Sequence, residues 1–222
     1  MWIRRSGYLG LLAVAAALVA IGWGAPAQAV TLGDLVGGDS LGSLDGNLVF
    51  SDFTGNISGA LNPDLDQYTV DALEHGFRIS GALSVADGRA GGLDITYTVT
   101  ALNSLQLTAA QIFFNAAVYG ETASATTMED LFTESGGSMI GELDLLVNDL
   151  GADTKYDETS FDPLAQLFVE KSISVDAQGA DAIAVTLSVV DQTFTVVPEP
   201  VSLPLLAAGL VGLVAARRRS RR

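Results

Sequence analysis

Apolar and polar residues alternate with a period of two along several segments of the chain. In 93–100 the odd positions hold Leu, Ile, Tyr and Val, and the even positions hold Asp and Thr. Successive side chains of a strand point to opposite faces of its sheet, so this pattern predicts a half-buried strand. Residues 185–189 repeat it, and 111–119, 142–147 and 167–175 are rich in apolar, β-branched or aromatic residues. We predict strands in all five segments.

Dipeptides that contain glycine lie between these runs and predict turns, because glycine reaches positive φ without steric cost. The pairs are Asp87-Gly88, Gly91-Gly92, Gly136-Gly137 and Gln178-Gly179. Strands at this spacing predict an all-β fold, a single antiparallel β-sandwich with a barrel or jelly roll as the alternative. We expect a loop or weak edge strand at 32–47, which is rich in Gly, Asp and Ser, and short helical turns near 128–132 or 163–167.

The N-terminus has the three parts of a signal peptide. Arg4 and Arg5 precede an apolar stretch at 9–21, and Ala27-Gln28-Ala29 is a small-x-small cleavage site. We therefore predict that residues 1–29 are a signal peptide flanking a mature domain at 30–197, which is long enough for one core.

The C-terminus combines a short polar motif, an apolar run and a basic end. Pro198-Glu199-Pro200 precedes the uncharged run 201–216, which predicts a transmembrane helix. The last residues include five arginines, which are expected to stay in the cytoplasm because positive charge beside an apolar helix resists translocation. These arginines are Arg217, Arg218, Arg219, Arg221 and Arg222.

This order resembles the PEP-CTERM sorting signal of Gram-negative bacteria, a tail domain also labelled ice-binding protein C-terminal. Gly209-Leu210 and Gly212-Leu213 are similar to the Gly-Leu spacing of its helix. The resemblance covers only 198–222 and implies processing by an exosortase, after signal peptidase has acted at the other end. It implies a precursor held transiently in the inner membrane, then a cell-surface or extracellular protein associated with exopolysaccharide or biofilm. An ordinary membrane anchor is the alternative.

The segment 30–197 is strongly acidic. All 26 acidic residues except Glu199 lie in it, whereas its only basic residues are Arg78, Arg89, Lys155 and Lys171. Such a surface repels polyanions, so nucleic acid is not an expected partner. The chain has no cysteine, so the exported domain must be held by packing and not by disulfides.

Few residues suggest chemistry. His75 is the only histidine and lies in an expected turn, with no Gly-x-Ser-x-Gly elbow to accompany it. We interpret it as a surface or packing residue. Paired carboxylates hydrolyse glycosides, but spacing in a sequence does not show which of them face each other. We assign no catalytic residue and expect a non-enzymatic protein.

Calcium is the ion that best suits such carboxylates, and extracellular sites bind it weakly. Asp64 and Asp66, or Asp153, Asp157 and Glu158, could supply ligands, but neither segment fits the EF-hand pattern. We favour solvated acidic loops and assign no cofactor or metal site.

Two further motifs have ordinary explanations. Thr96, Thr98 and Thr100 would share one strand face, but an ice-binding surface needs the ladder repeated on neighbouring strands. Asn56-Ile57-Ser58 matches a glycosylation sequon that a bacterial protein need not use, and we interpret it as turn chemistry.

The preferred hypothesis is therefore a non-enzymatic exported surface or matrix protein. The alternative is a carbohydrate- or calcium-binding module, which predicts a concave site with clustered Tyr, Phe and acidic residues. A third hypothesis, a hydrolase, predicts a cleft with a carboxylate of raised pKa.

Overall fold

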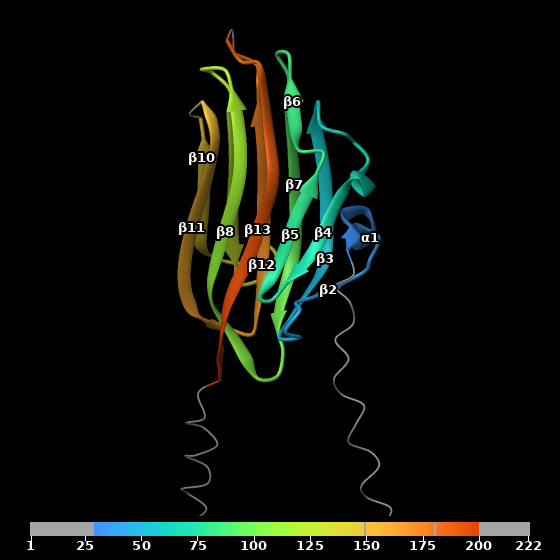
Figure 1. Ribbon diagram of the computed structural model, residues 1–222. Coiled ribbons are helices and arrows are strands. Elements are labelled where there is room, and N and C mark those ends of the chain that lie inside the picture. Colours follow the sequence, from blue (N-terminus) through green and yellow to red (C-terminus); the bar gives the residue numbers. More distant parts are fainter. Residues whose placement is uncertain (1–28, 149, 180, 200–222) are drawn as a thin grey trace, which may run out of the picture.

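Two antiparallel sheets packed face to face form the body of the molecule (Figure 1). The computed structural model describes residues 29–148, 150–179 and 181–199. Over these residues the strands form two open sheets, which confirms the all-β sandwich. In the same ranges no helix is long and apolar enough to span a membrane. The predicted helix at 201–216 and residues 1–28 of the predicted signal peptide lie outside the described residues.

The first sheet has six strands in the order β10-β9-β12-β7-β3-β2. They are β2 (Leu41–Gly42), β3 (Leu48–Gly59), β7 (Ala90–Ala101), β9 (Ser124–Phe132), β10 (Met139–Val147) and β12 (Gln166–Asp176). The strands predicted at 93–100, 142–147 and 167–175 are confirmed. The turn predicted at Gly91-Gly92 is wrong, because both residues lie in β7. A Cβ on Gly91 would meet the Leu61 side chain at 2.7 Å, so glycine serves close packing there.

The second sheet has the order β1-β4-β5-β13-β8-β11, and β6 also pairs with β13. Its strands are β1 (Val30–Thr31), β4 (Tyr68–Leu73), β5 (Gly76–Gly81), β6 (Ser84–Ala86), β8 (Leu105–Tyr119), β11 (Gly151–Leu164) and β13 (Ala184–Pro198). The strands predicted at 111–119 and 185–189 are confirmed. The acidic loop expected around Asp153, Asp157 and Glu158 is wrong, since these residues lie in the edge strand β11.

The core lies between the sheets and is filled by the inward side of each alternating strand. Phe50, Phe77 and Tyr97 are fully buried, and Phe53 packs beside them. The Phe50 and Phe77 rings are 5.0 Å apart between centroids at an interplanar angle of 84°, an edge-to-face pair. Burying one side chain of this size contributes about 1.5–3 kcal/mol to the free energy of unfolding.

The segment 32–47, expected to be a loop or edge strand, contains both a short helix and β2. The helix α1 (Leu32–Val36) begins with a capping box, in which Thr31 accepts from the Asp34 N–H and Asp34 accepts from the Thr31 N–H, both at 3.1 Å. Leu32 and Leu35 on α1 are fully buried. A 3₁₀ turn, η1 (Leu65–Gln67), lies against the same helix.

Of the other turns predicted from the sequence, some are confirmed and others are wrong. Asp87 and Gly88 have φ of 56° and 75°, and Gly136 has φ of 73°, so these two turns are confirmed. The helical turns expected near 128–132 and 163–167 are wrong, because the first range lies in β9 and the second spans the end of β11 and the start of β12. The turn expected at Asn56-Ile57-Ser58 is also wrong, since the three residues lie within β3.

The last strand runs directly into the predicted sorting motif Pro198-Glu199-Pro200. Pro198 is the last residue of β13 and pairs with Leu105 of β8. The N–H of Glu199 then donates to the carbonyl of Ser104 at 2.9 Å. No spacer therefore separates the sheet from the motif, whereas Pro200 and the five terminal arginines lie outside the described residues.

Candidate functional site

An open groove crosses the outer face of the six-stranded sheet. One part, of about 410 Å³, lies over β3, β7, β12 and the loop that follows β9. A second part, of about 290 Å³, lies over β7, β9 and β12. Thr96 lines both depressions, so they adjoin at this residue, and we call the surface formed by the two depressions the Thr96 groove.

Two threonines of β7, Thr96 and Thr98, line this groove because the strand alternates. Tyr97 and Val99 are fully buried, so Thr96, Thr98 and Thr100 share the outer face as predicted. Thr54 of β3 lies opposite Thr96, and their hydroxyl oxygens are 2.7 Å apart. On the other side of β7, however, the partners of the three threonines are Glu170, Phe168 and Gln166. The threonine ladder required of an ice-binding face is therefore absent from β12.

A β-bulge brings Asp52 to the groove. The pairing of β3 with β7 shifts between Ser51 and Thr54, where one extra residue enters β3. Asp52 adopts a φ of 56°, while the next side chain, Phe53, enters the core. A non-glycine residue with positive φ costs conformational energy. The bulge thus exposes a carboxylate at the groove and interrupts the hydrogen-bond ladder between β3 and β7.

Phe168 provides an aromatic wall in an otherwise polar surface. It stands at an outward position of β12, between the buried residues Leu167 and Val169. Phe132 of β9 is its cross-strand partner, and the two ring centroids are 6.4 Å apart at 52°. This tilted contact supports the Phe168 ring from one side while the ring lines the groove.

Carboxylates follow one another across the second part of the groove. Glu142, Asp130 and Glu170 occupy directly opposed positions on β10, β9 and β12. Like charges directly opposite each other destabilise a sheet, so this row is unfavourable for stability alone. Nearby, the Ser172 hydroxyl donates to the Asp94 carboxylate at 2.8 Å. The groove therefore offers many acceptors, several hydroxyl groups and one aromatic ring.

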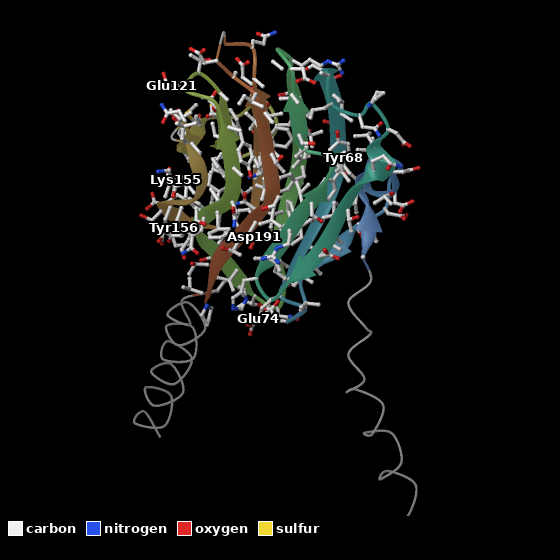
Figure 2. The ribbon with its side chains drawn as sticks, turned by 45° about the horizontal axis from the view of Figure 1, so that its top comes forward. Tyr68, Glu74, Glu121, Lys155, Tyr156 and Asp191 are labelled. Carbon is white, nitrogen blue, oxygen red and sulfur yellow. The ribbon has the colours of Figure 1, made fainter. Side chains whose placement is uncertain are left out.

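The outer face of the seven-stranded sheet has a different character. Arg78 and Asp191 form a two-point ion pair there, with N–O distances of 2.6 and 2.7 Å. Figure 2 shows Asp191 on this face, with Tyr156 nearer the β11 edge. The Tyr156 hydroxyl donates to the carboxylate of Glu158, two residues further along β11. These four polar side chains of the face are thus occupied by one another.

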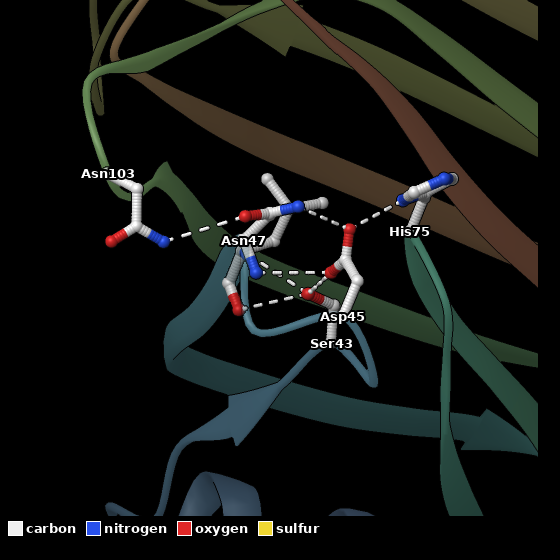
Figure 3. Close-up of polar contacts among 6 residues, drawn as sticks. Ser43, Asp45, Asn47, His75 and Asn103 are labelled. Atoms are coloured by element: carbon white, nitrogen blue, oxygen red, sulfur yellow. Dashed lines mark hydrogen bonds and ion pairs between the residues drawn. The ribbon is translucent and has the colours of Figure 1, made fainter. Parts of the chain in front are cut away.

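His75 lies in the turn between β4 and β5, as expected, and its side chain contacts a carboxylate. Its Nδ1 is 2.8 Å from Asp45, which accepts from the Ser43 hydroxyl and from Asn47 (Figure 3). Burial raises the pKa of the Asp45 carboxyl, but hydrogen bonds from Ser43 and Asn47 and the contact with His75 lower it below its ordinary value. Because Ser43 bonds the carboxylate and not the imidazole, the cluster lacks the order of a catalytic triad.

A cavity of about 450 Å³ lies beside His75 and Glu74. Its aromatic residue, Phe194, is 2% exposed, so it presents almost no ring surface to a ligand. The Thr96 groove is therefore the stronger candidate site.

The residues considered for calcium have other partners. Asp64 caps η1 by accepting from the Asp66 N–H at 3.1 Å, and Asp66 accepts from the Thr31 hydroxyl. On β11, a hydrogen bond from Lys155 lowers the pKa of Asp153. Within 29–148, 150–179 and 181–199 no three acidic or histidine side chains are grouped so that they could hold a metal ion.

Sequence reasoning missed the residues that shape the groove. Phe168 had a readable signal, since an aromatic residue occupies a position where the alternation of 167–175 calls for a polar one. Asp52 had none, because a bulge depends on pairing with a distant strand.

No protein-family model and no curated protein matches the chain. Solved structures give only weak similarity. The enzymatically active domain of tailspike protein 4 from bacteriophage CBA120 aligns at a TM-score of 0.34 and 13% identity over 65% of this chain. The chain spans only 20% of that protein's length.

TmCBM61 in complex with β-1,4-galactotriose aligns at a TM-score of 0.33 and 12% identity, over 65% of this chain and 88% of that one. A family 16 carbohydrate-binding module aligns at 0.27 and 10%, over 59% and 85%. Similarity at this level carries no argument about ligand or activity, which must come from the groove itself.

Proposed function

We propose that the domain is a carbohydrate-binding module of an exported protein, and that the Thr96 groove holds a neutral glycan. The observation that carries this proposal is the combination, in the first part of the Thr96 groove, of the Phe168 ring with hydroxyl, amide and carboxylate groups. Polar groups that converge on an apolar wall are the usual make-up of a small-molecule site.

The polar groups suit a polyhydroxylated ligand. Hydroxyl groups of a sugar both donate and accept, and Thr96 and Thr98 offer the same capacity on the protein side. The Gln166 amide adds a donor and an acceptor, while Asp52 and Glu134 accept strongly from hydroxyl donors. The C–H face of a pyranose ring can lie against Phe168.

The negative charge of the groove restricts which glycans we expect to bind. Asp94, Asp130 and Glu170 line the second part of the groove, where Lys171, the one basic residue, turns its ammonium group into the core. Such a surface repels uronic acid, sulfate and phosphate groups, and more so at low ionic strength. The ligand is therefore a neutral glycan, and an anionic exopolysaccharide is disfavoured.

Binding without turnover is part of the proposal. A glycosidase places two carboxyl groups on either side of the scissile bond. Asp130 and Glu170 instead project from adjacent positions on one sheet face, below any ligand in the groove. Calcium receives no role, because the acidic residues considered for it have other partners.

The location outside the cell rests on the two chain ends. We propose that signal peptidase removes 1–29 and that an exosortase acts on the tail beginning at Pro198. The product is a cell-surface or extracellular domain, in which glycan binding provides the association with exopolysaccharide or biofilm.

Glycan-array binding by the purified protein tests the proposal, with and without calcium. We expect binding to neutral oligosaccharides that does not require calcium. Phe168→Ala should weaken binding about tenfold through loss of the aromatic wall. Tyr156→Ala is the matched control, since it removes an exposed ring from the other sheet. Equal losses in both variants, or no binding to any neutral glycan, would refute the proposal.

A further inference from the structure

Three polar side chains meet in the core, on the inner side of the six-stranded sheet. Lys171 of β12 and Glu129 of β9 are directly opposed in the six-stranded sheet and both point inward. Their side chains are 0% exposed. Gln192 of β13 reaches them from the seven-stranded sheet and is also fully buried.

The contacts bring an amine, a carboxyl group and a primary amide together. Lys171 Nζ donates to Oε1 of Gln192 at 2.7 Å and forms an ion pair with Glu129. The Gln192 amide also lies close enough to Glu129 to lower its carboxyl pKa, although no bond of regular geometry joins Nε2 to it. The buried Tyr97 hydroxyl nearby has no hydrogen-bond partner either.

Stability alone is a poor explanation for this cluster. A buried ion pair loses its hydration, and apolar residues of similar volume usually serve a core as well. Here the Gln192 Nε2 group is also left without a partner, which costs the full desolvation of a donor. The arrangement nevertheless has the parts needed for an acyl transfer from a primary amide to an amine.

We propose that Lys171 and Gln192 join in a self-formed amide cross-link, with Glu129 carrying the protons. Lys171 first gives a proton to Glu129, and its neutral Nζ attacks Cδ of Gln192. The new Nζ–Cδ bond forms as the Cδ–Nε2 bond breaks. Glu129 passes its proton to Nε2 and takes a second proton from Nζ, which keeps one hydrogen as the N–H of the new amide. Ammonia leaves, a secondary amide remains, and no oxidant or cofactor is required.

The surroundings favour this reaction. Burial is the main cause that raises the pKa of Glu129, against the opposing effect of Lys171, which favours the protonated carboxyl formed in the first step. The low-dielectric core likewise favours the neutral pair over the charged one. Fixed side chains hold the amine against the amide, which makes the step intramolecular.

The link would tie the two sheets together. Lys171 lies in β12 and Gln192 in β13, which belong to opposite layers of the sandwich. The chain has no cysteine, so disulfides do not supply such a tie. A cross-link restricts the unfolded chain in the same way as a disulfide does, and should raise the melting temperature.

Intact-mass spectrometry of the purified protein tests the proposal. We expect a mass lower than that of the processed sequence by one molecule of ammonia, and a branched peptide joining Lys171 to Gln192 after digestion. Glu129→Gln and Lys171→Met should each restore the full mass. Lys155→Met, which changes a lysine on the edge strand, should retain the loss.

The unmodified protein decides the question even if the core variants do not fold. Full mass in the folded wild type would overturn the proposal. An ammonia loss that maps to any pair other than Lys171 and Gln192 would overturn it as well.

Discussion

Asp52 combines an unusual backbone conformation with a position at the groove. Its φ of 56° is tolerated by Asp and is easier for Gly, but is strained for a β-branched residue. We expect Asp52→Val to lower the free energy of unfolding by about 1–2 kcal/mol. Asp52→Gly should leave stability nearly unchanged while it weakens glycan binding, because the carboxylate is lost.

Denaturant unfolding and binding assays on the two variants separate these effects. Equal stability of the Val and Gly variants would contradict the role of the bulge. Unchanged glycan binding by the Gly variant would contradict the role of the carboxylate.

Asp45 predicts a pH dependence of stability. The pKa of its carboxyl is lowered in the folded protein, so the folded state binds fewer protons than the unfolded state as the carboxyl titrates. The stability it contributes is present above its unfolded pKa and is lost as the pH falls through the folded pKa. Asp45→Asn should therefore cost about 1 kcal/mol near neutral pH and little in strong acid.

Urea unfolding at several pH values measures this difference. A stability loss that is constant from neutral pH into strong acid would contradict the explanation, because it would not follow the charge of Asp45.

The pairing of β5 with β13 depends on a close approach at Gly76. A Cβ at this position would lie 1.7 Å from the carbonyl oxygen of Gln192. Because that neighbour is backbone, it cannot move aside as a side chain would. We expect Gly76→Ala to lower the free energy of unfolding by about 2–4 kcal/mol.

Gly42→Ala in β2 is the matched control, since its new Cβ would meet nothing closer than 4.0 Å. Thermal unfolding should show a clear drop in melting temperature for the first variant and almost none for the second. Similar melting temperatures would refute the close approach.

The alternating strands β7 and β12 could be predicted from the sequence, and the edge strand β11 could not. In β7 and β12 the inward positions are apolar, so their alternation is visible in the sequence. In β11 both faces remain partly open to solvent, and polar residues occupy both sets of positions. The helix α1 had a signal that went unused, namely Thr31 followed three residues later by Asp34, which form its capping box.

The buried cluster and the Thr96 groove could each be predicted from the sequence only in part. Lys171, Glu129 and Gln192 each occupy a position where the strand pattern calls for an apolar residue, which is a readable sign of a buried polar group. The contact among these three side chains could not be predicted from the sequence, because it joins residues of two different sheets. The Thr96 groove likewise depends on the register of β3, β7 and β12, which no local pattern determines.

The molecule as a whole is an acidic sandwich whose last strand leads directly into Pro198-Glu199-Pro200. We expect replacement of these three residues by alanine to block C-terminal processing and leave the precursor in the inner membrane. Mass spectrometry and membrane fractionation of the native host would measure both. Pro163→Ala, on β11, is a control that should process normally, and normal processing of the motif variant would favour an ordinary anchor.

Amide chemical-shift mapping shows directly whether the Thr96 groove binds a glycan. Titration with a neutral oligosaccharide identified on the array should shift amides of β3, β7 and β12 around Thr96 and Phe168, and leave those around Asp191 unchanged. Shifts confined to the seven-stranded sheet, or no saturable shifts with any neutral oligosaccharide, would contradict the account.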